Sequence, residues 1–180
     1  LEGLGLDINH PHLRDSPRRT AEAWRDDLAS GLLEKDFSLE VFPVEEGHQS
    51  GLVMLSQIPV KSLCAHHLLP FYGHAAVGYY PDRSLCGLSN LSRATNHFAR
   101  RPQLQEHLGN EVAHYLMGAL QPQGVGVVIK ATHFCMTVRG VNHPGVMTTS
   151  CLLGNFHDDP AVRHEFLAAA GADPAPNLPG

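Results

Sequence analysis

An apolar stripe between residues 104 and 120 constrains the fold of this 180-residue chain more than any other feature of its sequence. Its members recur at helical spacing and predict one long amphipathic helix after Pro102: Leu104, Leu108, Val112, Tyr115, Leu116, Ala119 and Leu120. The stretch 125–138 that follows is rich in β-branched residues at its heart and is expected to be a strand. A helix with one apolar face must bury that face, here against a sheet.

Along the whole chain the expected order is helix, strands, two helices, strands, helix. Strands are expected at 37–43, 52–63, 71–80 and 147–153, a loop at 45–51, and further helices at 16–31, at 89–100 and from 160 onward. Ser16 and Ser89 are expected to cap their helices, because a serine hydroxyl accepts a hydrogen bond from a backbone N–H of the first turn. In the last helix, Val162, Phe166 and Leu167 are expected to face inward.

The expected strands come in sequential pairs joined by short turns. Such pairs favour an antiparallel sheet with helices packed on one side, which places the chain in the α+β class. An open sheet of this kind leaves two edges with unpaired backbone groups. A homo-oligomer that joins sheets edge to edge is therefore expected.

Composition argues against nucleic acid and membranes as partners of this chain. Lysine and arginine number 13 against 18 acidic residues, a net charge of −5, so no broad basic surface for nucleic acid is expected. No run approaches the roughly 18 apolar residues of a membrane span, and residues 1–8 lack the pattern of a signal peptide. Four cysteines in a chain this long indicate reduced thiols in the cytoplasm rather than a disulfide scaffold, with Cys86 and Cys151 as core residues.

One short string combines a thiol with two imidazoles: Cys64-Ala65-His66-His67. A second thiol, Cys135, lies far along the chain on an expected strand. Zinc binds thiolate and imidazole, and a catalytic zinc uses three protein ligands and keeps a fourth position open. A strand would point residues 64 and 67 to opposite faces, so the string must turn. From the spacing alone, a metal site and a buried thiol beside surface histidines are equally open interpretations.

Several further strings are similar to those of one enzyme family. They are Ser16-Pro17-Arg18-Arg19, CAHHLLPF at 64–71, Gly87-Leu88-Ser89, FARRPQLQE at 98–106, His133-Phe134-Cys135-Met136, Val138-Arg139-Gly140, Gly154-Asn155-Phe156 and HEFL at 164–167. Because these strings occur in the family's order and with its spacing, the chain resembles GTP cyclohydrolase I, which converts GTP into 7,8-dihydroneopterin triphosphate and releases formate. The resemblance favours the metal interpretation and implies a zinc ion bound by Cys64, His67 and Cys135.

The resemblance also implies an architecture. The family has the tunnelling fold (T-fold), an antiparallel sheet with two helices packed on one side, and assembles as a toroidal homodecamer with active sites between subunits. For this chain it implies an N-terminal helical and extended segment at 1–50, a T-fold catalytic domain at 51–170 and a disordered tail at 171–180. Exposed sheet edges are consistent with an oligomer but give no number of subunits.

Catalytic roles follow from the resemblance as expectations. Zinc lowers the pKa of a bound water to about 7, which suits attack on the electron-poor C8 of guanine. Ring opening and formate release then need proton transfer near N7 and N9. His133, two residues before Cys135 on the expected strand, and His66 match the family histidines that serve there. As bare sequence, each is equally a core histidine. Ser89 matches the family serine near the ribose, which serves in the later sugar rearrangement and ring closure.

Substrate-binding residues are implied in the same way. Gln105 and Glu106 match the family's guanine-reading pair, and the triphosphate arginines are matched by Arg19, Arg93 and Arg139. A carboxylate accepts hydrogen bonds from the ring N–H and the 2-amino group of guanine, and guanidinium forks suit phosphate oxygens. Without the resemblance, Glu106 is a carboxylate at a helix start and each arginine is ordinary surface charge.

Three departures from the family pattern lie near the expected site. Ala65 stands where the family usually has Glu, Asn90 stands where it has a phosphate-binding Lys, and the loop 144–150 is shorter than usual. The expected function is zinc-dependent GTP cyclohydrolase I activity on GTP. Two alternatives stay open: a divergent paralogue that opens the ring of GTP or another guanine derivative but gives a different product, and a catalytically inactive binding subunit.

Overall fold

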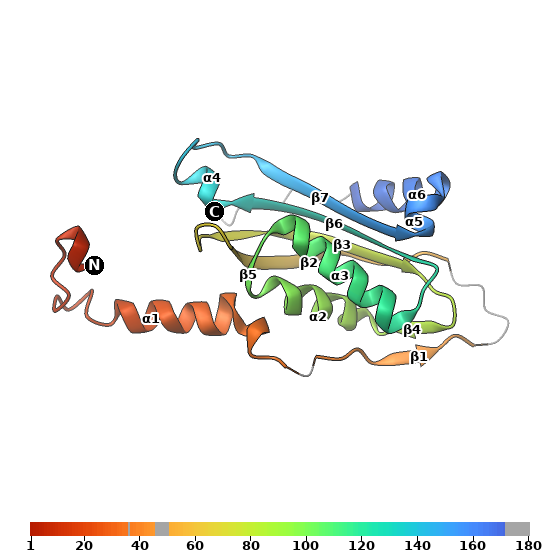
Figure 1. Cartoon of the computed structure of the whole chain (residues 1–180), viewed down its shortest axis with the longest axis horizontal. Helices are drawn as coiled ribbons and strands as arrows, with labels where there is room; N and C mark the ends of the chain where they lie inside the picture. The colour runs from red at the N-terminus through yellow and green to blue at the C-terminus, as the bar shows by residue number, and fades with distance from the viewer. Residues whose placement is uncertain (36, 46–50, 172–180) are drawn as a thin grey trace.

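A computed structural model describes residues 1–35, 37–45 and 51–171 of the chain. A twisted sheet forms its middle, helices lie on both faces of that sheet, and a helical arm extends at the N-terminal end (Figure 1). The strands are β1 Val41–Pro43, β2 Val53–Cys64, β3 Pro70–Tyr80, β4 Ser84–Cys86, β5 Pro102–Gln103, β6 Gly124–His133 and β7 Val146–Gly154. The helices are α1 Ser16–Ala23, α2 Leu88–Ala99, α3 Gln105–Leu120, α4 Phe134–Thr137, α5 Asn155–Asp158 and α6 Pro160–Gly171, with short helical turns η1 Glu2–Leu4, η2 Trp24–Leu28 and η3 Ser30–Leu32.

Five strands form the main sheet in the order β5-β2-β3-β6-β7. The pairs β2–β3, β3–β6 and β6–β7 are antiparallel, whereas the short β5 runs parallel to β2. A second, smaller sheet consists of β1 and β4. The α+β class and the antiparallel sheet expected from the sequence are therefore confirmed.

The main core lies between the sheet and the two helices α2 and α3, which share one face (Figure 1). Helix α3 buries residues four apart in this core, and β6 buries every second residue: Leu108, Val112, Leu116 and Leu120 of α3, and Val125, Val127, Ile129 and Ala131 of β6. Each leucine or valine buried in this way contributes about 1.5–3 kcal/mol to folding. The helix expected from the apolar stripe is confirmed as α3, and the paired helices on one face are confirmed with it.

The opposite face of the sheet is covered by α5 and α6. Gly126 of β6 makes this packing possible, because a Cβ there would lie 2.6 Å from the ring of Phe166 and 2.7 Å from that of Phe156. Phe166 is fully buried, as expected, but Leu167 is 39% exposed, so its expected inward orientation is wrong. Ala170 is buried instead, since it lies one helical turn after Phe166 on the same face.

The N-terminal arm differs in detail from the single helix expected at 16–31. It consists of α1, the π-helical turn η2 and the 3₁₀ turn η3 in succession. Asp15 holds the N-cap position and no side-chain cap hydrogen bond is made, so the cap expected at Ser16 is wrong. Gly31 ends the arm against α2, where a Cβ would lie 2.2 Å from the backbone oxygen of His97. The close approach explains a glycine at this position.

Two further expectations are corrected at helix starts. Ser89 is the second residue of α2 and is exposed, while Gly87 is the N-cap residue without a side-chain cap hydrogen bond. The strand expected at 125–138 ends at His133, and the chain then turns through the short helix α4. Cys135 therefore lies on a helical turn rather than on a strand.

Some expectations fall outside the described residues. Of the strand expected at 37–43, β1 forms at its end, while residue 36 just before it is not described. Most of the loop at 45–51 and of the tail at 171–180 lies outside the described part of the chain. Among the helices that are described, none is long and apolar enough to cross a membrane.

Candidate metal centre and substrate site

Two of the three expected zinc ligands meet at one end of the main sheet. The sulfurs of Cys64 and Cys135 are 3.9 Å apart, and a ring nitrogen of His133 lies within 4.8 Å of both. Cys64 ends β2, His133 ends β6, and Cys135 lies on the α4 turn that follows β6. The end of β2 thus meets the β6–α4 junction, which lies about 70 residues further along the chain, and brings two thiols and an imidazole together; Cys64 and His133 are buried.

The string 64–67 turns as its spacing requires. The backbone N–H of Leu68 donates to the carbonyl of Cys64 at 2.8 Å, and Leu68 takes a left-handed conformation with φ of 52°. His66 and His67 lie on this turn with exposed side chains, and their ring centroids are 6.2 Å apart. The ring of His67 is not part of the thiol–imidazole group, in which His133 takes the place expected for it.

Burial and the neighbouring thiol dominate the electrostatics of Cys135. Burial raises the pKa of the Cys135 thiol, and the hydrogen bond and charge of Cys64 raise it further. Arg139 acts in the opposite direction, which places its guanidinium within electrostatic reach of the thiol pair. A cation between the two sulfurs reverses this balance, because a thiol that coordinates a metal is deprotonated.

His133 is held in place on two sides. Its ring stacks on Phe71 with centroids 4.5 Å apart and planes 10° from parallel. Its Nε2 lies 2.8 Å from Oε1 of Gln105. Burial lowers the pKa of His133, while the carboxylate of Glu106 opposes that shift. The imidazole is therefore neutral at pH 7, as a general base or a metal ligand must be.

The expected guanine-reading pair divides into two different environments. Gln105 is 1% exposed, and its side chain hydrogen bonds inward to the sheet and to His133. Glu106 is exposed in the first turn of α3, close enough to His133 to affect its pKa. The side chain of Gln105 is committed inside the protein, so Glu106 is the member of the pair left to meet a substrate.

Two groups of expected residues lie at opposite ends of α2. The first group, called here the thiol end, comprises Cys64, Cys135, His133, Gln105 and Glu106. It adjoins the C-terminal end of α2, because β5 follows that helix and pairs with the end of β2. The second group, called here the arginine end, comprises Ser89, Asn90 and Arg93 in the first turns of α2. At about 1.5 Å per residue, the ten steps from Ser89 to Ala99 separate the two ends by roughly 15 Å.

Arg93 lies in a framework of contacts at the arginine end. One of its N–H groups donates to Oδ1 of Asn90 at 3.0 Å, and its guanidinium lies 5.4 Å from the ring centroid of Phe37. Asn90 is 3% exposed and donates in turn to the backbone oxygen of Glu40 at 3.0 Å. From the sequence, Asn90 is noted only because the family usually has lysine at this position. No sequence pattern predicts its contact with the segment before β1.

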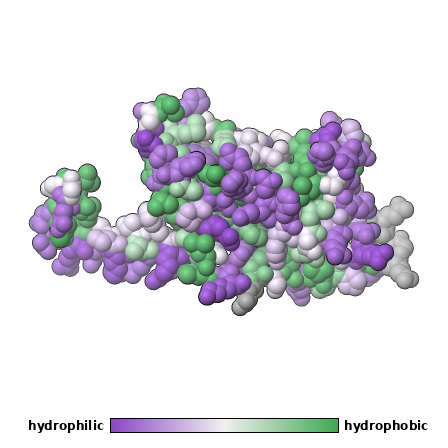
Figure 2. Space-filling model, viewed as in Figure 1, coloured by the Kyte–Doolittle hydropathy of each residue, from purple (hydrophilic) through white to green (hydrophobic). Residues whose placement is uncertain are grey.

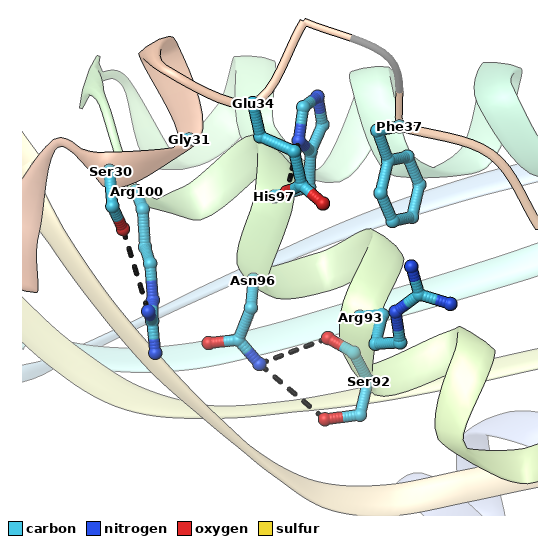
Figure 3. Close-up of a pocket in the computed structure, with 9 residues that line it drawn as sticks. All are labelled: Ser30, Gly31, Glu34, Phe37, Ser92, Arg93, Asn96, His97 and Arg100. Carbon is cyan, nitrogen blue, oxygen red and sulfur yellow. Dashed lines mark hydrogen bonds and ion pairs between the residues drawn. The ribbon is translucent and has the colours of Figure 1, made fainter.

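A cavity of about 480 Å³ opens beside Arg93, between α2 and the side chains or backbone of Ser30, Gly31, Glu34 and Phe37. Figure 3 shows Arg93 turned toward Phe37, with Arg100 at the other end of the cavity near Ser30. His97 also lines the cavity. Its Nδ1 contacts Glu34 at 3.1 Å and its ring stacks on Phe37, and these contacts fix its position. The cavity runs along α2 from Arg93 to Arg100, and neither thiol of the thiol end lines it.

The remaining expected arginine stands apart from both ends. Arg19 lies on α1 in the N-terminal arm, 70% exposed, with an ion pair to Asp15 at 3.8 Å. Figure 2 shows this arm as a mostly hydrophilic extension from the body of the molecule. Among the described residues, no hydrogen bond or ion pair links Arg19 or Arg93 to the thiol pair.

Fold and site together define a class: an α+β protein with a thiol–imidazole group of the kind that can hold a metal ion, at the end of an antiparallel sheet. Comparison with known proteins makes the class specific. The family model described as GTP cyclohydrolase I matches residues 1–171. The chain belongs to the GTP cyclohydrolase I family.

Curated relatives support this membership over nearly the whole chain. GTP cyclohydrolase 1 of Sulfurihydrogenibium sp. is 45% identical over 168 residues, which cover 93% of this chain and 87% of the relative. GTP cyclohydrolase 1 of Aquifex aeolicus is 44% identical, with 93% and 89% covered. GTP cyclohydrolase 1 of Lysinibacillus sphaericus is 46% identical over 172 residues, with 93% and 89% covered.

Proposed function

We propose that the chain is a zinc-dependent GTP cyclohydrolase I. It opens the imidazole ring of the guanine base of GTP at C8, releases formate and closes a new ring to give 7,8-dihydroneopterin triphosphate. The observation that carries this proposal is the meeting of Cys64, Cys135 and His133 beside Glu106, in a chain of this family.

The donor set fits zinc. Thiolate and imidazole are the ligands that zinc favours, and three protein ligands leave a position open for chemistry. Cys64 and Cys135 are the two thiolate ligands, and His67, on the turn directly after Cys64, is the imidazole ligand. When bound, zinc supplies a Lewis acid that lowers the pKa of water and so activates it for attack at C8.

The zinc content of two variants decides between the two imidazoles near the thiols. His67→Ala is expected to lose the metal after purification, as measured by elemental analysis. His133→Ala is expected to keep the metal but to lose turnover. The reverse pattern would make His133 the third ligand, in agreement with its position beside both sulfurs.

His133 then serves as a proton-transfer group. It is neutral because burial lowers its pKa, so it can accept a proton near guanine N7 or N9 as the ring opens. His66, on the exposed turn beside His67, is the second proton-transfer group. Ser89 acts later, near the ribose, in the sugar rearrangement that precedes ring closure.

Glu106 selects guanine. Its carboxylate accepts hydrogen bonds from the ring N–H and the 2-amino group together, an arrangement that adenine does not offer. The triphosphate is bound by Arg19, Arg93 and Arg139, since guanidinium groups match phosphate oxygens. Arg139 is already close to the thiol end, as its effect on Cys135 indicates.

The separation of the thiol end from the arginine end supports an assembled enzyme. Arg93 and Ser89 serve the substrate of another copy, and Arg19 is presented by its exposed arm in the same way. The assembly is the toroidal homodecamer of T-fold subunits, with active sites between copies. The four free cysteines suit a reducing compartment and support a cytoplasmic location.

Formate release tests the proposal directly. The purified protein is incubated with GTP, first with zinc and then after removal of the metal by a chelator. Zinc-dependent formate release is expected, with recovery when zinc is added back. Absence of formate under both conditions contradicts the proposal, and a ring-opened formamide as the final product would indicate a diverted activity.

A further inference from the structure

The side chain of Gln105 connects the sheet to the imidazole of His133, and this connection assigns it a role. We infer that Gln105 is a positioning residue that holds His133 in the tautomer with its proton on Nε2, leaving Nδ1 as the basic nitrogen. The tautomer follows from the hydrogen bonds alone, while its consequence for turnover rests on the proposed function.

The orientation of the Gln105 amide is fixed by its partners on β6 and β7. Its Nε2 lies 3.0 Å from the backbone oxygens of Ile129 and Met147 and 3.1 Å from Oγ1 of Thr149. Carbonyl oxygens only accept hydrogen bonds, so the amide nitrogen must face them. The reversed amide would place its own oxygen against two carbonyl oxygens, and that orientation is excluded.

The orientation of the amide determines the tautomer of the histidine. With Nε2 of Gln105 facing the strands, Oε1 faces Nε2 of His133 at 2.8 Å. An amide oxygen has no proton to donate, so His133 must donate from its Nε2. In a neutral imidazole one nitrogen carries the proton, and the other, Nδ1, then carries the lone pair.

Burial makes the arrangement rigid. Gln105 is 1% exposed and His133 is 8% exposed, so water does not replace either partner readily. The stack of His133 on Phe71 keeps the ring plane aligned with the amide. A ring flip would leave the Gln105 oxygen buried without a donor, which the packing around it penalises.

The assignment differs from the guanine-reading role that sequence similarity implies for Gln105. In the proposed reaction, a histidine with a fixed basic Nδ1 needs no rearrangement before it accepts a proton. Gln105 therefore acts on the rate of the chemical step through His133, whereas Glu106, its exposed neighbour, acts on substrate binding.

Neutron diffraction from crystals of the deuterated, metal-loaded protein tests the tautomer without any activity measurement. We expect deuterium on Nε2 of His133 and on the Gln105 nitrogen that faces Ile129 and Met147. Deuterium on Nδ1 alone, or a Gln105 amide with its oxygen toward the strands, overturns the inference. Because the observation is made on the unmodified chain, it stands even when a variant fails to fold.

Two variants then test the consequence. Gln105→Leu keeps a similar size but removes the acceptor, and we expect a roughly 10- to 100-fold lower kcat for formate release with little change in the KM for GTP. Thr149→Val is the matched control, since it removes one partner of the amide nitrogen and leaves the contact with His133 intact. Its kcat is expected to stay within about threefold of the unmodified enzyme.

The outcomes separate the inference from the proposed function. A higher KM with unchanged kcat in Gln105→Leu would return Gln105 to guanine reading and contradict the positioning role. An unmodified protein that shows the expected tautomer but releases no formate would defeat the proposed function and leave the tautomer assignment standing. A thermal-unfolding profile of each variant identifies loss of fold as a separate cause.

Discussion

The thiol end and the arginine end of the molecule differ in burial and in how their polar groups are paired. At the thiol end, buried side chains from β2, β6 and α3 meet the half-buried Cys135 of α4, and Gln105 of α3 hydrogen bonds to the backbone of the sheet. At the arginine end, Arg93 borders a cavity and is held by Asn90 and Phe37 without a carboxylate partner in the described part of the chain. The first end is therefore held by contacts within one chain, whereas the second leaves the charge of Arg93 without an acidic partner among the described residues.

The largest expected effect comes from removing a thiol. Cys135→Ala leaves two ligands of three, so the protein is expected to purify without zinc and to lose roughly a thousandfold in turnover, several kcal/mol of charge stabilisation. Elemental analysis and formate release measure the two losses.

Cys151→Ala provides the matched control for the thiol. Cys151 is also buried, but its sulfur contacts Oδ1 of Asn110 rather than the thiol pair. It is expected to keep its zinc and its activity. Equal zinc loss in both variants would mean that cysteine burial, rather than the thiol pair, controls the metal.

A mixing experiment tests whether the two ends belong to different copies. Arg93→Ala alone is expected to raise the KM for GTP by about tenfold or more, since one charged hydrogen-bond partner of phosphate is lost. The Cys135→Ala chain alone is expected to be inactive.

Co-expression of the two variants is expected to restore sites in which one chain supplies the thiols and another supplies Arg93. With random assembly, roughly a quarter of all sites are complete. High-affinity activity that is no greater than the sum of the separate variants would place both ends in the same chain and contradict the comparison.

Glu106→Gln is expected to have an intermediate effect. The loss of a charged acceptor for guanine should lower kcat/KM for GTP by roughly 10- to 100-fold. The zinc content should not change, because Glu106 is not among the ligand atoms near the thiols. A variant that turns over GTP normally would remove Glu106 from guanine recognition.

The smallest expected effect concerns Asn90, at which the family usually has lysine. Asn90→Lys breaks the hydrogen bonds to Arg93 and to the backbone of Glu40, so we expect a loss of about 1–3 kcal/mol in the free energy of unfolding and no improvement in the KM for GTP. Chemical denaturation measures the stability and steady-state kinetics the KM. A lower KM at unchanged stability would show that this end tolerates a phosphate-binding lysine after all.

The features that sequence predicted are those determined locally. The stripe of α3, the strands β2 and β3 and the turn after Cys64 follow from periodicity and turn residues, and the structure confirms them. The pairing of Cys64 with Cys135 was also anticipated, because the strings around both cysteines match one family.

The features that sequence missed depend on contacts between distant segments. The sequence predicts one strand through both His133 and Cys135, whereas β6 ends at His133 and Cys135 lies on the α4 turn. Valine-rich periodicity does not mark where a strand stops. The inward orientation of Gln105 depends on carbonyl groups of β6 and β7, more than 20 residues away. The N-cap of α2 is Gly87, whereas the sequence predicts a cap at Ser89.

The most direct test of the central claim follows one carbon atom. GTP labelled with ¹³C at C8 is incubated with the zinc-loaded protein, and the products are identified by mass spectrometry. The label is expected in formate, and 7,8-dihydroneopterin triphosphate is expected to form without it. Label retained in a ring-opened formamide, or GTP recovered unchanged, would contradict GTP cyclohydrolase I activity.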